Sequence, residues 1–78
     1  MKVAAKAFVL IETAVGRTRE VAKALEKLGG VDSVDMVTGP YDLIVVIERD
    51  KLADIGDMVT GKIHTVSGIS RTVTCLVV

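Results

Sequence analysis

Several residue types are scarce in this 78-residue chain, and each scarcity argues against a class of site. Cys75 is the only cysteine, so the chain cannot form an internal disulfide. His64 is the only histidine, so a zinc site would consist mostly of carboxylates or be shared between chains. Only Phe8 and Tyr41 are aromatic, too few for the base-stacking platform of an RNA-binding sheet. We therefore expect no metal site and no cofactor.

The chain also lacks a net charge and a long apolar run. Ten Lys and Arg balance ten Asp and Glu. This balance predicts no direct binding to nucleic acid, whose affinity comes from clustered cations, and no preference for an anionic membrane. No stretch approaches the roughly 18 apolar residues of a spanning helix. The apolar run at residues 7–11 is shorter than the ~7–15 residues at the centre of a signal peptide. We expect a cytoplasmic protein with one domain, residues 1–78.

What the chain has in abundance is β-branched residues, since 27 of its 78 residues are Val, Ile or Thr. Such residues favour strands. The alternation of apolar residues predicts strands at residues 3–12, 33–38, 43–48 and 69–78. Helical spacing predicts two helices, one at residues 17–28 and one at 50–64 with Leu52, Ile55, Val59 and Ile63 on one side.

The predicted order is strand-helix-strand-strand-helix-strand, and it contains a repeat. Gly30-Val31 after the first helix matches Gly68-Ile69 after the second, 38 residues later. Two interleaved β-α-β units predict a ferredoxin-like α+β fold, a four-stranded antiparallel sheet with both helices on one face. The first and third strands are central in such a sheet, and they are the strands that are apolar on both sides.

Because the helices cover one face only, the other would lie bare in a monomer. We expect Phe8 and Leu10, or the residues that alternate with them, together with Leu76 and Val78 on that bare face. An apolar patch of this kind normally marks an interface. The sequence therefore predicts a homodimer that packs sheet to sheet.

Polar groups gather at two places in the sequence. Gly39, Pro40, Tyr41 and Asp42 follow the second predicted strand, and their composition alone favours a plain hairpin turn. In the last predicted strand, residues 71–74 alternate polar and apolar, which by itself is typical of an ordinary half-exposed strand.

The lone histidine and cysteine are both interpreted as structural. His64 falls at the end of a predicted helix, where a cation suits the helix dipole, and no partner for catalysis is fixed near it in sequence. Cys75 stands in an apolar strand and is predicted to be a buried structural thiol.

The sequence Val-Thr-Gly-Pro-Tyr-Asp-Leu at residues 37–43 resembles the V-T-G-x-Y-D-L hairpin of the Lrp/AsnC family ligand-binding domain, also called RAM. Gly30-Val31-x-x-Val34 and Gly68-Ile69-x-Arg71-Thr72-x-Thr74 are similar to the same family. The resemblance covers essentially the whole chain.

This resemblance implies a non-catalytic module that binds an amino acid and oligomerises. Dimers of the family pair sheet to sheet and assemble into tetramers, octamers or similar rings, with amino acids bound between dimers near the hairpin. Asp42 is suited to an ammonium, and a backbone N–H near Gly39 or a threonine hydroxyl to a carboxylate. The implied ligand-binding residues are Thr38, Gly39, Tyr41, Asp42, Thr72 and Thr74.

Two departures from the family modify this expectation. Family regulators carry an N-terminal helix-turn-helix domain, whereas this chain begins at the first predicted strand. We thus expect a stand-alone effector sensor that modulates transcription of amino acid metabolism by assembling with a helix-turn-helix regulator. Pro40 replaces a commonly acidic residue and removes a backbone donor, which leaves the ligand's identity open. The alternatives are a structural assembly subunit without a ligand and a small ferredoxin-like dimeric enzyme.

Overall fold

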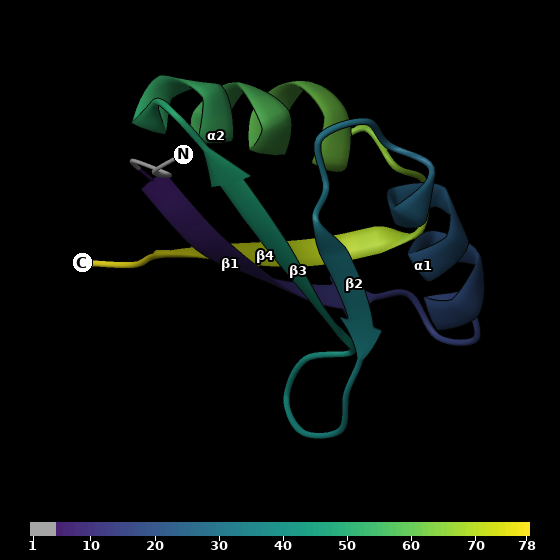
Figure 1. Ribbon diagram of the computed structural model, residues 1–78. Helices are drawn as coiled ribbons and strands as arrows, with labels where there is room; N and C mark the ends of the chain where they lie inside the picture. Colours follow the sequence, from purple (N-terminus) through teal and green to yellow (C-terminus); the bar gives the residue numbers. More distant parts are fainter. Residues whose placement is uncertain (1–4) are drawn as a thin grey trace.

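The computed structural model describes residues 5–78 and contains a four-stranded antiparallel sheet (Figure 1). Its strands are β1 (Ala5–Thr13), β2 (Ser33–Met36), β3 (Leu43–Arg49) and β4 (Ile69–Leu76), in the order β2-β3-β1-β4. The ferredoxin-like prediction is confirmed, and β1 and β3 are central as expected. β2 and β4 end two residues earlier than predicted. Residues 3 and 4, where the first strand was predicted to begin, lie outside the described residues.

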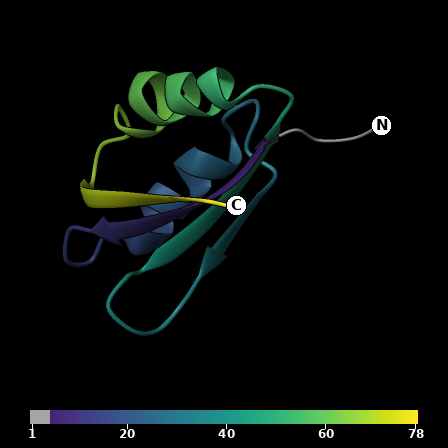
Figure 2. The ribbon, with the colours of Figure 1, turned by 90° about the vertical axis from the view of Figure 1, so that its left-hand side faces the viewer.

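The helical segments all lie over the same face of the sheet, as Figure 2 shows. They are α1 (Thr18–Glu26), α2 (Leu52–Met58) and a π-helical turn, η1 (Val59–Ile63). α1 is shorter than the predicted 17–28, and its chain leaves the helix before Gly30, which has a φ of +100°. A side chain there would also collide with Arg49 and Met58, so this turn requires glycine. Among residues 5–78, no helix is long and apolar enough to span a membrane.

The second helix departs from the regular spacing assumed for it. It begins at Leu52, and after Met58 the chain widens into η1, where the His64 N–H donates to the Val59 carbonyl 2.9 Å away. This five-residue step is the π-helical pattern. Ile55, Val59 and Ile63 are buried as predicted, but Leu52 is 56 % exposed. Leu52 lines a groove at the sheet edge together with Ile55 and Val59, so it shares their side of the helix but lies outside the core.

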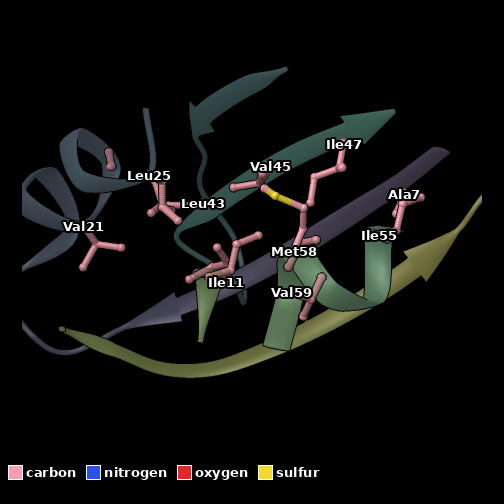
Figure 3. Close-up of a cluster of buried hydrophobic side chains, with 13 residues drawn as sticks. Ala7, Ile11, Val21, Leu25, Leu43, Val45, Ile47, Ile55, Met58 and Val59 are labelled. Atoms are coloured by element: carbon pink, nitrogen blue, oxygen red, sulfur yellow. The ribbon is translucent and has the colours of Figure 1, made fainter. Parts of the chain in front are cut away.

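The core lies between the helices and alternate residues of the two central strands (Figure 3). Ala7, Val9 and Ile11 of β1 have no exposed area, and they pair in register with three equally buried residues of β3, namely Ile47, Val45 and Leu43. Val21, Leu25, Ile55 and Ile63 close the core from the helix side. This side of the sheet is called the covered face below.

The remaining residues of the same strands form an open face. On β1 they are half-buried, and no element of the described chain packs over them. Register places β3 and β4 residues beside them on this face. The open face consists of Lys6, Phe8, Leu10 and Glu12 of β1, Ile44, Val46 and Glu48 of β3, and Arg71, Val73 and Cys75 of β4.

Three predictions about the last strand are wrong. Leu76 pairs with Ala7 and so belongs to the covered face, and Val78 lies beyond the end of β4. Cys75, predicted to be buried, is exposed. It pairs with Phe8 on the open face of an edge strand, where nothing in the described chain covers its thiol. Of the two alternating sets on β1, the set with Phe8 and Leu10 lies on the open face.

Candidate functional site

The hairpin between β2 and β3 projects beyond the end of the sheet (Figure 1). The Val37 N–H donates to the Asp42 carbonyl at 2.9 Å and closes a loop of residues 38–41. Gly39 has a φ of +109°, which side-chain-bearing residues rarely adopt, while the space around it is open. Thr38 and Gly39 are exposed. The loop is thus held by its backbone conformation and presents its residues to solvent.

Asp42 fastens this hairpin to the rest of the molecule. Its N–H donates to the Ile11 carbonyl at 2.8 Å. Its carboxylate Oδ2 accepts from the Thr13 N–H at 2.8 Å and from the Thr13 hydroxyl at 3.2 Å. The Thr13 hydroxyl also lies 2.7 Å from that of Thr18 in the first turn of α1. Both hydrogen bonds that the described residues make to the carboxylate use Oδ2, and none of these residues donates to Oδ1.

Tyr41 is fastened to β4 by a residue that the sequence analysis did not assign to the site. Arg71 Nη2 donates to the Tyr41 hydroxyl at 2.8 Å, and its guanidinium carbon lies 5.6 Å from the ring centroid. The hydrogen bond and charge interaction with Tyr41, followed by the charge of Glu12, raise the pKa of Arg71. Arg71 therefore stays a cation beside the hairpin. Its position between Gly68 and Thr72 in the family-like pattern was the available signal.

Thr72 and Thr74 lie on the other side of the sheet from Arg71. They pair with Ile11 and Val9 and point to the side of the helices. The Thr72 hydroxyl lies 2.8 Å from His64 Nε2 at the end of η1, a contact that the sequence analysis did not foresee. The described residues of one chain therefore place Tyr41 with Arg71, and Thr72 with His64, in two separate groups.

A groove adjoins Thr74 between α2 and β4, and it is called the α2–β4 groove below. It has a volume of about 330 Å³. Its lining is Leu52, Ile55, Gly56, Val59, Thr60, Thr74 and Leu76. A second hollow of about 280 Å³ lies next along β4 and is lined by His64, Ile69, Ser70, Arg71 and Thr72. The helix side of β4 therefore carries a polar hollow and an apolar groove in succession.

The contacts among the described residues do not form a catalytic base or a metal site. The contact of His64 is a threonine hydroxyl and not a carboxylate that would orient an imidazole base. Within residues 5–78, no three His, Cys, Asp or Glu side chains gather closely enough to hold a metal ion. The polar side chains in the two groups offer hydroxyls, one carboxylate and one guanidinium, which are suited to hydrogen bonds and charge interactions.

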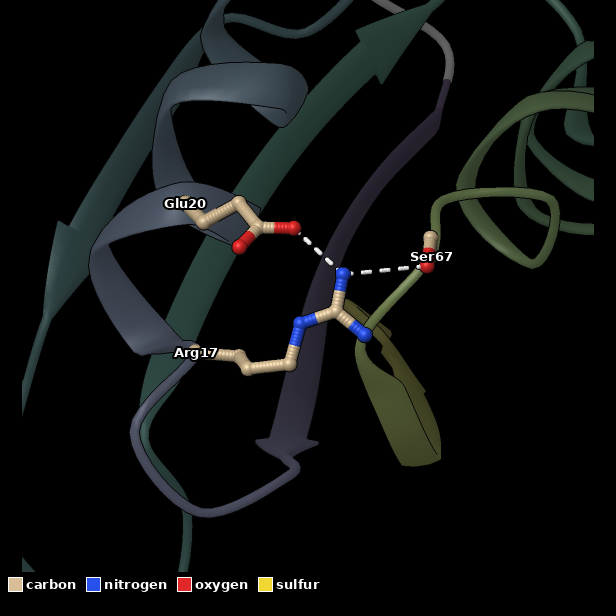
Figure 4. Close-up of polar contacts among 3 residues, drawn as sticks. All are labelled: Arg17, Glu20 and Ser67. Carbon is tan, nitrogen blue, oxygen red and sulfur yellow. Dashed lines mark hydrogen bonds and ion pairs between the residues drawn. The ribbon is translucent and has the colours of Figure 1, made fainter.

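Arg17 connects the start of α1 to the turn before β4 (Figure 4). Its Nη2 donates to the Ser67 hydroxyl at 3.0 Å and pairs with the Glu20 carboxylate. The hydrogen bond with Glu20, and then its charge, raise the pKa of Arg17, and the same contact lowers the pKa of Glu20. This exposed cluster fixes the approach of β4 to the helix layer.

Comparison with known proteins identifies related domains. Residues 6–78 match the family model described as Lrp/AsnC ligand binding domain. The uncharacterized HTH-type transcriptional regulator PF0250 of Pyrococcus furiosus is 34% identical over 71 residues, which are 87% of this chain and 47% of that protein. The chain spans between about a third and a half of the length of the curated relatives it matches.

Solved structures share the fold. Hypothetical protein PHS023 from Pyrococcus horikoshii superposes with a TM-score of 0.86 at 38% identity, over 95% of this chain and 89% of that one. Transcriptional regulator NMB0573 from Neisseria meningitidis, solved as a complex with L-Met, superposes with a TM-score of 0.84 at 18% identity. That match covers 97% of this chain and 51% of the regulator.

Proposed function

The chain belongs to the Lrp/AsnC ligand-binding domain family, and we propose that it is a non-catalytic, homo-oligomeric domain that binds an amino acid effector. The observation that carries the proposal is the hairpin, whose Asp42 is fixed through Oδ2 while Oδ1 is left for a ligand. In this proposal the effector acts on the assembly that the domain forms with itself or with a helix-turn-helix regulator of the family. Relatives named as HTH-type transcriptional regulators support that role.

An α-amino acid presents one cation and one anion on adjacent atoms. Its ammonium requires an acceptor such as Asp42 Oδ1, and a carboxylate that is already held by Thr13 loses little freedom when it accepts that charge. The effector's carboxylate requires donors. The hydroxyls of Thr38, Thr72 and Thr74 and the backbone near Gly39 are the donors we assign to it.

We place the complete site between two copies of the chain. Thr72 and Thr74 point to the helix side of β4, whereas the hairpin extends beyond the end of the sheet. A hairpin from one copy that approaches the β4 edge of another would combine the two groups around one ligand. The binding of an effector would then depend on assembly, and assembly on the effector.

The open face supplies a physical reason for a second copy. Its centre is apolar, with Phe8, Leu10 and Val46 adjacent in register. Removing apolar surface from water contributes roughly 25 cal/mol per Å². A second sheet packed against this face would provide that burial. We therefore propose sheet-to-sheet dimers as the unit from which larger rings form.

The experiment is a thermal-shift screen of the chain against the twenty L-amino acids, followed by titration of the variant Asp42→Asn. A ligand at 100 times its Kd adds about 2.7 kcal/mol to the free energy of unfolding, which raises Tm measurably. Asp42→Asn keeps an oxygen for Thr13 but replaces the second oxygen by an amide donor. Because a hydrogen bond to a charged group contributes about 1.5–3 kcal/mol, affinity should fall roughly 10- to 150-fold.

Asp32→Asn is the matched control. Asp32 also accepts a backbone N–H through its carboxylate, from Glu48 at 2.6 Å, but it precedes β2 and does not belong to the hairpin. This variant should leave affinity unchanged. If Asp42→Asn lowers Tm sharply and leaves the affinity per folded molecule as it was, Asp42 is a scaffold residue only. If no amino acid shifts Tm at millimolar concentration, the chain is better explained as a structural assembly subunit.

A further inference from the structure

We propose that the α2–β4 groove receives the effector's side chain and thereby selects amino acids with aliphatic side chains. The inference rests on the proposed function, because it takes Thr72 and Thr74 as the residues that hold the effector's carboxylate. It adds a chemical class of ligand and a determinant of specificity, Gly56, that lies on α2 and outside the family-like motifs.

The helix side of β4 changes from polar to apolar in one direction. Thr72, Thr74 and Leu76 pair with Ile11, Val9 and Ala7, so all three point to the same side. A strand rises about 3.4 Å per residue, which separates successive members by ~7 Å. An amino acid whose carboxylate lies at the threonines therefore reaches Leu76 with a side chain of three or four heavy atoms. His64 Nε2, 2.8 Å from the Thr72 hydroxyl, holds the polar end in place.

The lining of the groove is suited to an uncharged chain. Ile55 and Val59 form its buried part, and Leu52 and Leu76 flank it with 56 % and 46 % of their surface exposed. Thr60 and Thr74 are the only polar lining residues, and the Thr60 hydroxyl donates to the Gly56 carbonyl at 2.9 Å. A lysine or aspartate side chain would lose water there without gaining a partner of opposite charge. An aliphatic side chain would instead cover exposed leucine.

The size of the groove fits the same class. Its volume of about 330 Å³ lies near the lower end of the ~300–1,000 Å³ typical of small-molecule pockets. It is therefore sufficient for one amino acid side chain.

Gly56 is a position at which a substitution can test the groove. It lines the groove, and a Cβ built at this position would meet no atom within 4 Å. Gly61, in η1, also has no atom within 4 Å of such a Cβ, but it does not line the groove. Leucine is a better helix former than glycine at both positions. Gly56→Leu therefore fills the groove, and Gly61→Leu is its matched control.

The first measurement uses the unaltered chain. L-leucine, L-isoleucine and L-methionine should raise Tm at concentrations where L-lysine and L-aspartate do not. The second measurement titrates L-leucine by calorimetry into both variants, with circular dichroism to confirm their folding. Gly56→Leu should weaken binding at least tenfold, whereas Gly61→Leu should stay within about twofold of the unaltered chain. Gly56→Ala should give an intermediate loss, and it serves if Gly56→Leu fails to fold.

The outcomes separate the two proposals. If L-lysine or L-aspartate binds as tightly as L-leucine, or if folded Gly56→Leu and Gly56→Ala bind L-leucine normally, the groove does not select the side chain. In either case amino acid binding itself would stand. If none of the twenty amino acids binds, the proposed function and this inference both fail.

Discussion

The two faces of the sheet are built from the same strands but end up in different surroundings. On β1, Val9 and Ile11 lose all exposure under α1 and α2, while Phe8 and Leu10, which alternate with them, stay half-buried with no helix or strand of residues 5–78 packed over them. The backbone pairing is common to both sets, so the difference comes from the helix layer alone. The covered face buries its apolar residues within one chain, and the open face is the surface on which we propose that a second chain packs.

The two ends of the open face carry charged residues, whereas its centre is apolar. Lys6 pairs in register with Glu48 at one end, and Glu12 with Arg71 at the other. The apolar centre thus lies between two pairs of opposite charge. Stable protein interfaces have this arrangement of an apolar centre with a polar rim.

The largest effect is expected from a substitution on the open face. Leu10→Asp places a carboxylate in the middle of the proposed sheet-to-sheet contact. An uncompensated buried charge costs about 3–5 kcal/mol. Self-association should therefore weaken by more than about 100-fold, and the chain should dissociate and largely unfold. Sedimentation equilibrium at micromolar concentration measures the mass, with circular dichroism for the fold.

Val15→Asp is the control for this variant, because Val15 is 102% exposed in the turn after β1. It should leave both mass and fold unchanged. A folded monomer of the unaltered chain at micromolar concentration would contradict the proposed interface, as would a Leu10→Asp variant with its mass intact.

The second largest effect is expected from a substitution on the covered face. Ile11 has no exposed area and packs in the core, so Ile11→Ala leaves a cavity. Such truncations cost about 2–5 kcal/mol. The free energy of unfolding in urea should fall by this amount while the native assembly keeps its mass. If the mass instead falls at native conditions, the covered face also takes part in assembly and the contrast between the faces is weaker than the fold implies.

The sequence predicted the contrast between the faces but not which β4 residues belong to each. Alternation along a strand is a local property, so the sequence separated Phe8 and Leu10 from Val9 and Ile11, although it left open which set faces the helices. The face of Leu76 depends on how β4 pairs with β1, and a slip of one residue exchanges the faces. The pairing contains an irregularity between Glu12 and Thr13 that no local pattern signals. Cys75 was misplaced for the same reason.

The candidate site was predictable where it resembles a known hairpin and not where it depends on tertiary contacts. The resemblance supplied Tyr41 and Asp42, and their assignment to a ligand stays a prediction. The hydrogen bonds of Asp42 to Thr13 connect residues 29 positions apart, so no spacing rule reveals them. The contact of His64 with Thr72 depends on η1, and a π-helical turn is too rare to assume from sequence.

The smallest expected effect concerns the exposed contacts that Arg17 makes with Glu20 and Ser67 between α1 and β4. Glu20 pairs with Arg17 on the solvent side of the helix layer. Exposed pairs of this kind contribute little to stability. Glu20→Gln should therefore change Tm far less than Ile11→Ala does. An equal decrease in Tm would mean that the exposed contacts of Arg17, and not the buried core, hold the helices over the covered face.

The pH dependence of this pair has a definite sign. The hydrogen bond from Arg17, and then its charge, lower the pKa of Glu20 in the folded state. The folded chain therefore binds this proton less readily than the unfolded chain does. The stabilisation is complete above the ordinary carboxyl pKa and disappears as the pH falls through the lower folded value. The stability curves of the unaltered chain and Glu20→Gln should thus differ slightly near neutral pH and converge in acid. Urea unfolding at a series of pH values measures both curves, and a difference that grows toward acid would show that the pair does not act as an ion pair in the folded protein.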